Sequence, residues 1–167
     1  MNDNTLDIFE DVSNPLDSIE ELLSVNDWIF NRPNPEELTV HVSGKLGSYH
    51  LAFIWQEEYS AMQFFCEFEN LKIPGERMEM ANRTLARMNE RLWLGHFEVP
   101  ENTAAPRFRH TSLFRGWTNT SGADQVEDLV DLALIECERH HNIFNMLATT
   151  TVLDGRTLEL MLHEEAG

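Results

Sequence analysis

Three consecutive stretches between residues 38 and 68 alternate apolar and polar side chains, and this pattern constrains the fold more than any other feature of the chain. A period of two residues places every second side chain on the same face of a β-strand. The segment GKLG separates the first stretch from the second, and EEYS separates the second from the third. The pattern therefore predicts an antiparallel meander of three strands with one buried face. Its expected inward residues are Leu38, Val40, Val42, Tyr49, Leu51, Phe53, Trp55, Met62, Phe64, Cys66 and Phe68.

Helical spacing of apolar residues flanks this meander on both sides. Apolar residues recur at intervals of three and four in residues 14–26, 74–95 and 122–147, which predicts three helices that each bury one stripe. The first begins with Asn-Pro, a pair typical of a helix N-terminus. The segment NRPNPEE, which follows the first helix, carries two prolines and is interpreted as a break.

The segment NERLWLGHFEV joins the second expected helix to a strand. Leu92 and Trp93 are expected to close the apolar face of the helix. Gly95 is expected to end it, because glycine readily adopts the positive φ of a helix C-cap. Phe97 then starts a strand that packs under the helix, with His96 on the opposite face. The segment is therefore interpreted as a structural junction and not as a catalytic site.

A hairpin of residues 96–99 and 107–115 contains the strongest candidate for a metal site. If Val99 pairs with Arg107, His96 lies roughly opposite His110, and two imidazoles across a strand pair can bind a metal ion. No third ligand is evident beyond Glu98. The favoured interpretation is that each imidazole makes a hydrogen bond at a partly buried strand surface.

Together these elements predict an α+β fold in which helices pack on an antiparallel sheet, with the element order α-β-β-β-α-β-β-α. Residues 1–13 are expected to form an acidic flexible arm, since so little apolar surface cannot offset the entropy of ordering. Residues 14–147 are expected to form the domain. Residues 148–167 are expected to form an acidic C-terminal tail with a short helix that contains Leu158, Met161 and Leu162.

The formal net charge of −17 argues against several partners. Nucleic-acid binding draws on clustered Lys and Arg to release counterions, so neither nucleic acid nor an anionic membrane is an expected partner. Residues 1–27 hold eight acids and no base, where a secretory signal needs a basic stretch before an apolar core. We therefore expect a cytoplasmic protein whose partners are other proteins.

Catalytic patterns are weak in this sequence. Glu136 and His140 share a helix face, but the segment lacks the two-histidine spacing of a zinc-protease helix. Cys66 and Cys137 fall on apolar faces, where a free thiol behaves as a small hydrophobe, and neither has an activating base nearby in the sequence. No enzyme activity and no cofactor are therefore expected.

Residues 77–115 form the one basic zone, with seven bases against four acids. Arg83, Arg87 and Arg91 lie four residues apart on the side of the second helix away from its apolar stripe. They can form ordinary surface pairs, such as Glu79 with Arg83. Our functional hypothesis is that they dock an acidic element, either the chain's own N-terminal arm or a partner segment.

Two aromatic residues add a second indication of a binding surface. Phe65 is expected to point away from the buried face of the meander, and Trp117 follows the last strand. A contiguous apolar patch at these positions would indicate a dimer interface or a peptide groove. Phe65 and Trp117 therefore join the three arginines as candidate partner-binding residues.

With these motifs in place, the chain resembles the YbjN family, described as bacterial sensory-transduction regulators. The resemblance runs from about Pro15 to Leu147. It is carried by the segments NPLDSIEELLSVNDW, NERLWLGHFEV, FRHTSLFRG and VEDLVDLALIECERH. The family is similar in fold to class I type III secretion chaperones, which are small, acidic and usually dimeric α+β proteins that bind extended protein segments. The resemblance implies a binding or regulatory role and transfers no active-site residue.

The sequence thus predicts a non-enzymatic homodimer that binds protein segments, in the manner of a chaperone-like regulator of a sensory or stress response. Binding would bury apolar side chains of the partner, aided by main-chain pairing at a sheet edge. Two rival hypotheses stay open. One is a metal-binding protein or enzyme that uses His96 and His110, and the other is a small-molecule sensor with a pocket between sheet and helices.

Overall fold

Residues 14–114 and 119–165 are described by the computed structural model, and this part of the chain contains four α-helices and six β-strands. The helices are α1 (Leu16–Val25), α2 (Met78–Asn89), α3 (Asn119–Thr149) and α4 (Gly155–Glu164). The strands are β1 (Phe30–Asn34), β2 (Glu37–Ser43), β3 (Ser48–Gln56), β4 (Ala61–Phe68), β5 (His96–Glu98) and β6 (Arg107–Leu113). Two short 3₁₀ helices, η2 (Glu57–Tyr59) and η3 (Gly75–Arg77), lie in the connections before β4 and α2.

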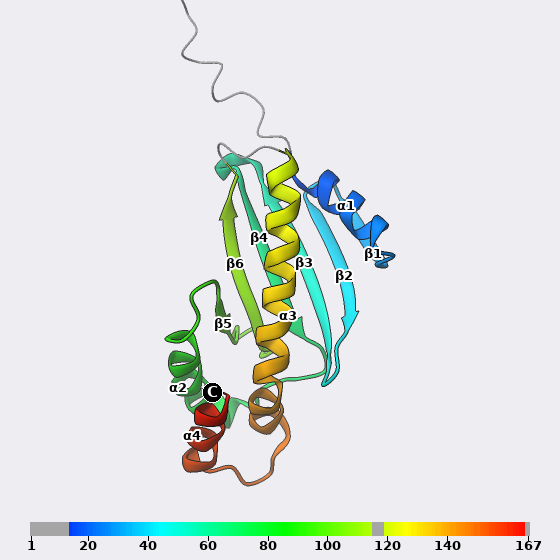
Figure 1. The fold of residues 1–167 in the computed structure, drawn as a ribbon. Coiled ribbons are helices and arrows are strands. Elements are labelled where there is room, and N and C mark those ends of the chain that lie inside the picture. The colour runs from blue at the N-terminus through cyan, green and yellow to red at the C-terminus, as the bar shows by residue number, and fades with distance from the viewer. Residues whose placement is uncertain (1–13, 115–118, 166–167) are drawn as a thin grey trace, which may run out of the picture.

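All six strands form one antiparallel sheet in the order β1-β2-β3-β4-β6-β5, and α3 lies across one face of it (Figure 1). The predicted α+β class is confirmed. Ten of the eleven residues expected to face inward from the meander are buried, and Val42 is half-buried. The alternation of apolar and polar residues thus predicts correctly which face of the sheet the helices cover.

One strand, β1, is missing from the expected element order. Strand β1 overlaps the segment NRPNPEE, which was interpreted as a break. It pairs with β2, with Phe30 opposite Val40 and Asn31 opposite Thr39, before the register shifts. Pro33 lies in this strand and has no N–H to donate, which an edge strand tolerates and a central strand does not. The sheet therefore has six strands, and its first edge is irregular.

The core lies between the sheet and α3, a helix of 31 residues. Cys137 and Phe144 on α3 are fully buried against the sheet. The Phe144 ring packs 4.8 Å from that of Phe68 and 5.3 Å from that of Phe97, measured between centroids. Such aromatic pairs stabilise a core beyond the area they bury. No helix in residues 14–114 and 119–165 combines the length and the apolar character needed to cross a membrane.

The junction after α2 differs in part from the expectation. The helix ends at Asn89 instead of Gly95, and the Trp93 side chain is 83 % exposed, so the expectation that Trp93 closes the apolar face is wrong. Gly95 does adopt a positive φ of 65°. Asn89 fastens the returning strand, because its side chain accepts from the N–H of Phe97 at 2.7 Å and donates to the Phe97 carbonyl at 3.0 Å. Phe97 is buried and His96 is exposed, as predicted.

Candidate partner-binding surface

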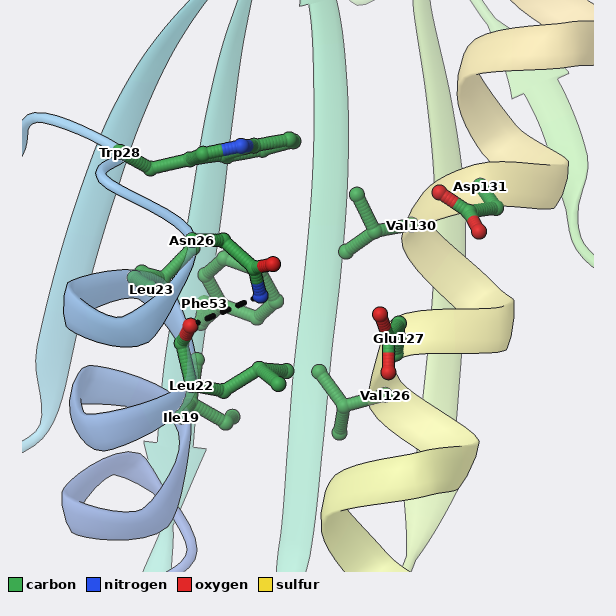
Figure 2. Close-up of a pocket in the computed structure, with 10 residues that line it drawn as sticks. All are labelled: Ile19, Leu22, Leu23, Asn26, Trp28, Phe53, Val126, Glu127, Val130 and Asp131. Carbon is green, nitrogen blue, oxygen red and sulfur yellow. Dashed lines mark hydrogen bonds between the residues drawn. The ribbon is translucent and has the colours of Figure 1, made fainter.

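Helix α1 and the first half of α3 enclose a hollow above the sheet (Figure 2). Asn14 helps to begin α1, because its side-chain oxygen accepts from the N–H of Leu16 at 2.9 Å. At the other end, the Asn26 side chain donates to the carbonyl of Leu22 at 2.9 Å. Both termini of α1 are therefore held by local hydrogen bonds, and its apolar face is fixed toward α3.

The walls of the hollow are apolar and its size is that of one side chain. Val126 and Val130 on α3 point toward α1, while Phe53 forms the floor and Trp28 closes one end (Figure 2). The cavity volume is about 160 Å³. An apolar cavity of roughly 150 Å³ holds one benzene molecule. The lining residues are Ile19, Leu22, Leu23, Asn26, Trp28, Phe53, Val126, Glu127, Val130 and Asp131.

The rim on the α3 side is acidic. Glu127 and Asp131 are exposed and lie one helical turn apart, directly after Val126 and Val130. None of the ion pairs among the described residues involves either carboxylate. The hollow therefore combines an apolar interior with unneutralised negative charge at its mouth. That combination suits an apolar side chain that is followed or preceded by a cationic one.

The volume of this hollow also bears on the kind of occupant that it suits. Pockets for small-molecule ligands have volumes of roughly 300–1,000 Å³. The hollow between α1 and α3 is about half of the lower limit. Its size favours a single side chain of a protein partner over a free small molecule as the occupant.

His96 and His110 do not face each other. The expected pairing of Val99 with Arg107 is wrong by one residue, because Arg107 pairs with Glu98 and His96 pairs with Arg109. A shift of one residue moves a side chain to the other face of a sheet. His96 therefore lies on the face opposite α3, beside Glu98 at 3.4 Å, and His110 lies on the face that α3 covers. This pairing removes the geometric basis for a shared metal site.

Two of the three candidate arginines on α2 contact the C-terminal helix of the same chain. Arg87 forms an ion pair of 2.7 Å with Glu159 on α4, and Arg91 donates to the backbone carbonyl of Leu162. Arg83 stays largely exposed, with Glu79 at 3.8 Å. The acidic helix α4 thus covers part of the basic zone. The N-terminal arm expected at residues 1–13 lies outside the described residues. A role for the three arginines in binding another protein stays a prediction.

Phe65 lies on the sheet face opposite α3, as expected, but it is half-buried by two arginines. The Arg107 guanidinium carbon lies 4.4 Å from the centroid of the Phe65 ring, and that of Arg109 lies 5.6 Å from it. Glu98 completes the cluster with an ion pair of 2.6 Å to Arg107. The two cations therefore cover the ring from the neighbouring strand β6. Trp117, the other aromatic candidate, lies outside the described residues.

The residues that line the hollow were not identified as a site from the sequence. Val126 and Val130 belong to the apolar stripe expected within residues 122–147, and Trp28, Glu127 and Asp131 are not among the candidate site residues. The available signal was the repeated pair of Val and acid in VEDLVD, which places apolar and acidic side chains side by side on one helix. The opposite wall comes from a helix about 100 residues earlier, which no local pattern reveals.

The comparisons with known proteins identify one family. Residues 15–145 match the family model YbjN, described as "putative bacterial sensory transduction regulator". Comparison with curated proteins gives no match. Among solved structures, the chain is similar to a crystal structure of "YbjN, a putative transcription regulator from E. coli", with a TM-score of 0.48 and 11 % identity. The match covers 75 % of this chain and 93 % of that chain.

Proposed function

The chain belongs to the YbjN family, and from this premise we propose that it is a non-enzymatic protein-binding module that acts as a regulator. In this proposal a partner segment places one apolar side chain in the hollow between α1 and α3 and a cationic side chain beside Glu127 and Asp131. The observation that carries the proposal is an apolar cavity sized for a single side chain beneath an acidic rim. The same mode of binding would serve a chaperone-like regulator.

Simple energetics define what kind of partner this site can hold. Burying a Phe or Leu side chain contributes about 1.5–3 kcal/mol, and an exposed ion pair adds up to about 1 kcal/mol. Association costs at least about 4 kcal/mol of translational and rotational freedom. The hollow alone therefore gives weak binding. A physiological partner must add contacts from the residues that flank the anchor side chain.

A titration with three peptides tests the proposal on the full chain. The probe is acetyl-KKFKK, and the controls are acetyl-KKAKK, which lacks the apolar anchor, and acetyl-EEFEE, which reverses the charge. We expect weak binding of KKFKK, with amide shifts in the NMR spectrum at residues 19–28 and 126–131. The two controls should bind several times more weakly, because each lacks one of the two interactions. Equal binding of KKFKK and EEFEE, or shifts only elsewhere, would overturn the proposal.

Charge-removing variants test the rim directly. The double variant Glu127→Gln/Asp131→Asn should raise the Kd of KKFKK by about fivefold, since two exposed charge interactions amount to about 1 kcal/mol. The matched control is Glu57→Gln/Glu58→Gln, which removes two exposed acids on η2. The control should leave the Kd unchanged. An equal loss of affinity for KKFKK in both double variants would indicate a general effect of net charge and not a binding site.

A further inference from the structure

The two edges of the sheet differ in how well they are protected against pairing with another strand. At one edge, β1 contains Pro33 and a register shift, and both features discourage strand addition. At the other edge, β5 pairs only with Arg107–Arg109 of β6. Among the described residues, no strand pairs with the outer side of residues 110–113. These four residues, His-Thr-Ser-Leu, contain no proline and no lysine, which natural edges use as protection.

Gly95 is the reason why β5 stops short. Its φ of 65° turns the chain away from β6 just before His96, so that residues 92–94 do not extend the pairing. A side chain is also excluded there, because a Cβ at Gly95 would lie 2.2 Å from the Phe108 ring. The open segment of β6 is therefore a consequence of a built-in turn.

Exposed apolar side chains flank this open segment. Trp93 is 83 % exposed and Leu113 is 65 % exposed, and both line a hollow with Leu94 and with Leu129 and Leu132 of α3. A large aromatic side chain left in water beside free main-chain groups is unusual for a monomer surface. The arrangement has the two components of strand addition, which are main-chain pairing and pockets for side chains.

Charge distinguishes this surface from the hollow between α1 and α3. The hollow that Trp93 and Leu113 line has ten lining residues, and Asp128 is the single carboxylate among them. His110 also lines it, and burial lowers the pKa of that imidazole, with the nearby His96 as a second cause, so it is neutral at pH 7. A chain with a net charge of −17 repels its own copies least where the local charge is close to zero. The acidic hollow suits a basic partner, whereas this nearly neutral edge suits a like-charged one.

We propose that residues 110–113 of β6, together with Trp93 and Leu113, form the interface through which a second copy of this chain adds to the sheet. An antiparallel pair of identical edges is two-fold symmetric, so each strand offers the other the same residues and the contact closes at two copies. The pairing joins two six-stranded sheets into one continuous sheet. It uses residues separate from the α1–α3 hollow, and it does not depend on the proposed function.

Solution mass tests the interface. Sedimentation equilibrium of the full chain should give twice the chain mass at tens of micromolar. Leu113→Glu, which places a charge in each half of the contact, and Trp93→Ser should raise the dimer dissociation constant by at least about tenfold. The matched control is Ile29→Glu, because Ile29 is 88 % exposed and lies next to β1 at the opposite edge. Circular dichroism and thermal melting establish that all three variants fold.

Amide hydrogen exchange tests the main-chain pairing separately. Outward N–H groups within residues 110–113 should exchange slowly in the dimer and rapidly after dilution or in Leu113→Glu. A monomer at all concentrations, or a dimer that survives both Leu113→Glu and Trp93→Ser, would overturn the proposal. Slow exchange of these amides in a monomer would mean that another occupant, such as a segment of the same chain, covers the edge. That result would also overturn the proposal.

Discussion

The backbone N–H of Leu46 donates a 3.0 Å hydrogen bond to a carboxylate oxygen of Glu138, which joins the turn between β2 and β3 to α3. The turn contains two glycines, and both leave room for side chains of α3. A Cβ at Gly44 would lie 1.6 Å from the other carboxylate oxygen of Glu138, and a Cβ at Gly47 would lie 2.4 Å from Nε2 of His141. The glycines are therefore required by this contact between turn and helix.

Replacing Gly44 with alanine should destabilise the fold by about 1–3 kcal/mol, because the new methyl group displaces the Glu138 carboxylate and disturbs the bond to Leu46. Urea unfolding of the full chain measures the effect. Gly75→Ala is the matched control, since no atom lies within 4 Å of a Cβ at that position. Its stability should change by less than about 0.5 kcal/mol. Equal effects of the two substitutions would contradict the assigned contact.

The sequence predicts those features of the fold that depend on one element at a time. The inward residues of the meander and the positive φ of Gly95 follow from local periodicity and from the properties of glycine. Strand β1 does not, because it lacks alternation and exists through its pairing with β2. The expected register of β5 with β6 is wrong by one residue, because Gly95 packs over Phe108 and this contact sets the pairing. The α1–α3 hollow needs two helices brought together by the whole fold.

The second prediction concerns the core and its two buried thiols. The sulfur atoms of Cys66 on β4 and Cys137 on α3 lie 3.6 Å apart, and both residues are fully buried. Cys66→Ser places a hydroxyl among apolar groups. It should lower the free energy of unfolding by about 1–3 kcal/mol more than Cys66→Ala does, since serine and alanine have nearly the same volume. Chemical unfolding of the two variants checks the difference. If serine and alanine are equally tolerated, the site is more polar than the packing indicates.

Histidine burial predicts how stability depends on pH. Burial lowers the pKa of His141, with the charge of Glu138 opposing the shift. As the pH falls below about 6.5, the unfolded state therefore takes up a proton at this imidazole before the folded state does. His141 thus lowers the free energy of unfolding below that pH and does not change it at higher pH. His141→Gln should reduce the decrease in unfolding free energy between pH 7 and pH 5. His50→Gln, an exposed position on β3, is the control and should keep the decrease of the parent protein.

The C-terminal helix gives the last prediction, because it carries two leucines with opposite environments. Leu158 of α4 is 3 % exposed and packs into the core, and Leu160 is 57 % exposed on the same helix. Leu158→Ala should destabilise the docked helix by about 2–5 kcal/mol through lost burial and an incompletely filled cavity, whereas Leu160→Ala should change it by less than about 0.5 kcal/mol. Hydrogen exchange of the amides in residues 155–164, read against those of β3 and β4, measures the free energy of opening α4. Similar exchange in the two variants would mean that α4 is not held by its apolar face, and that the Arg87–Glu159 pair and the bond from Arg91 to Leu162 fix it alone.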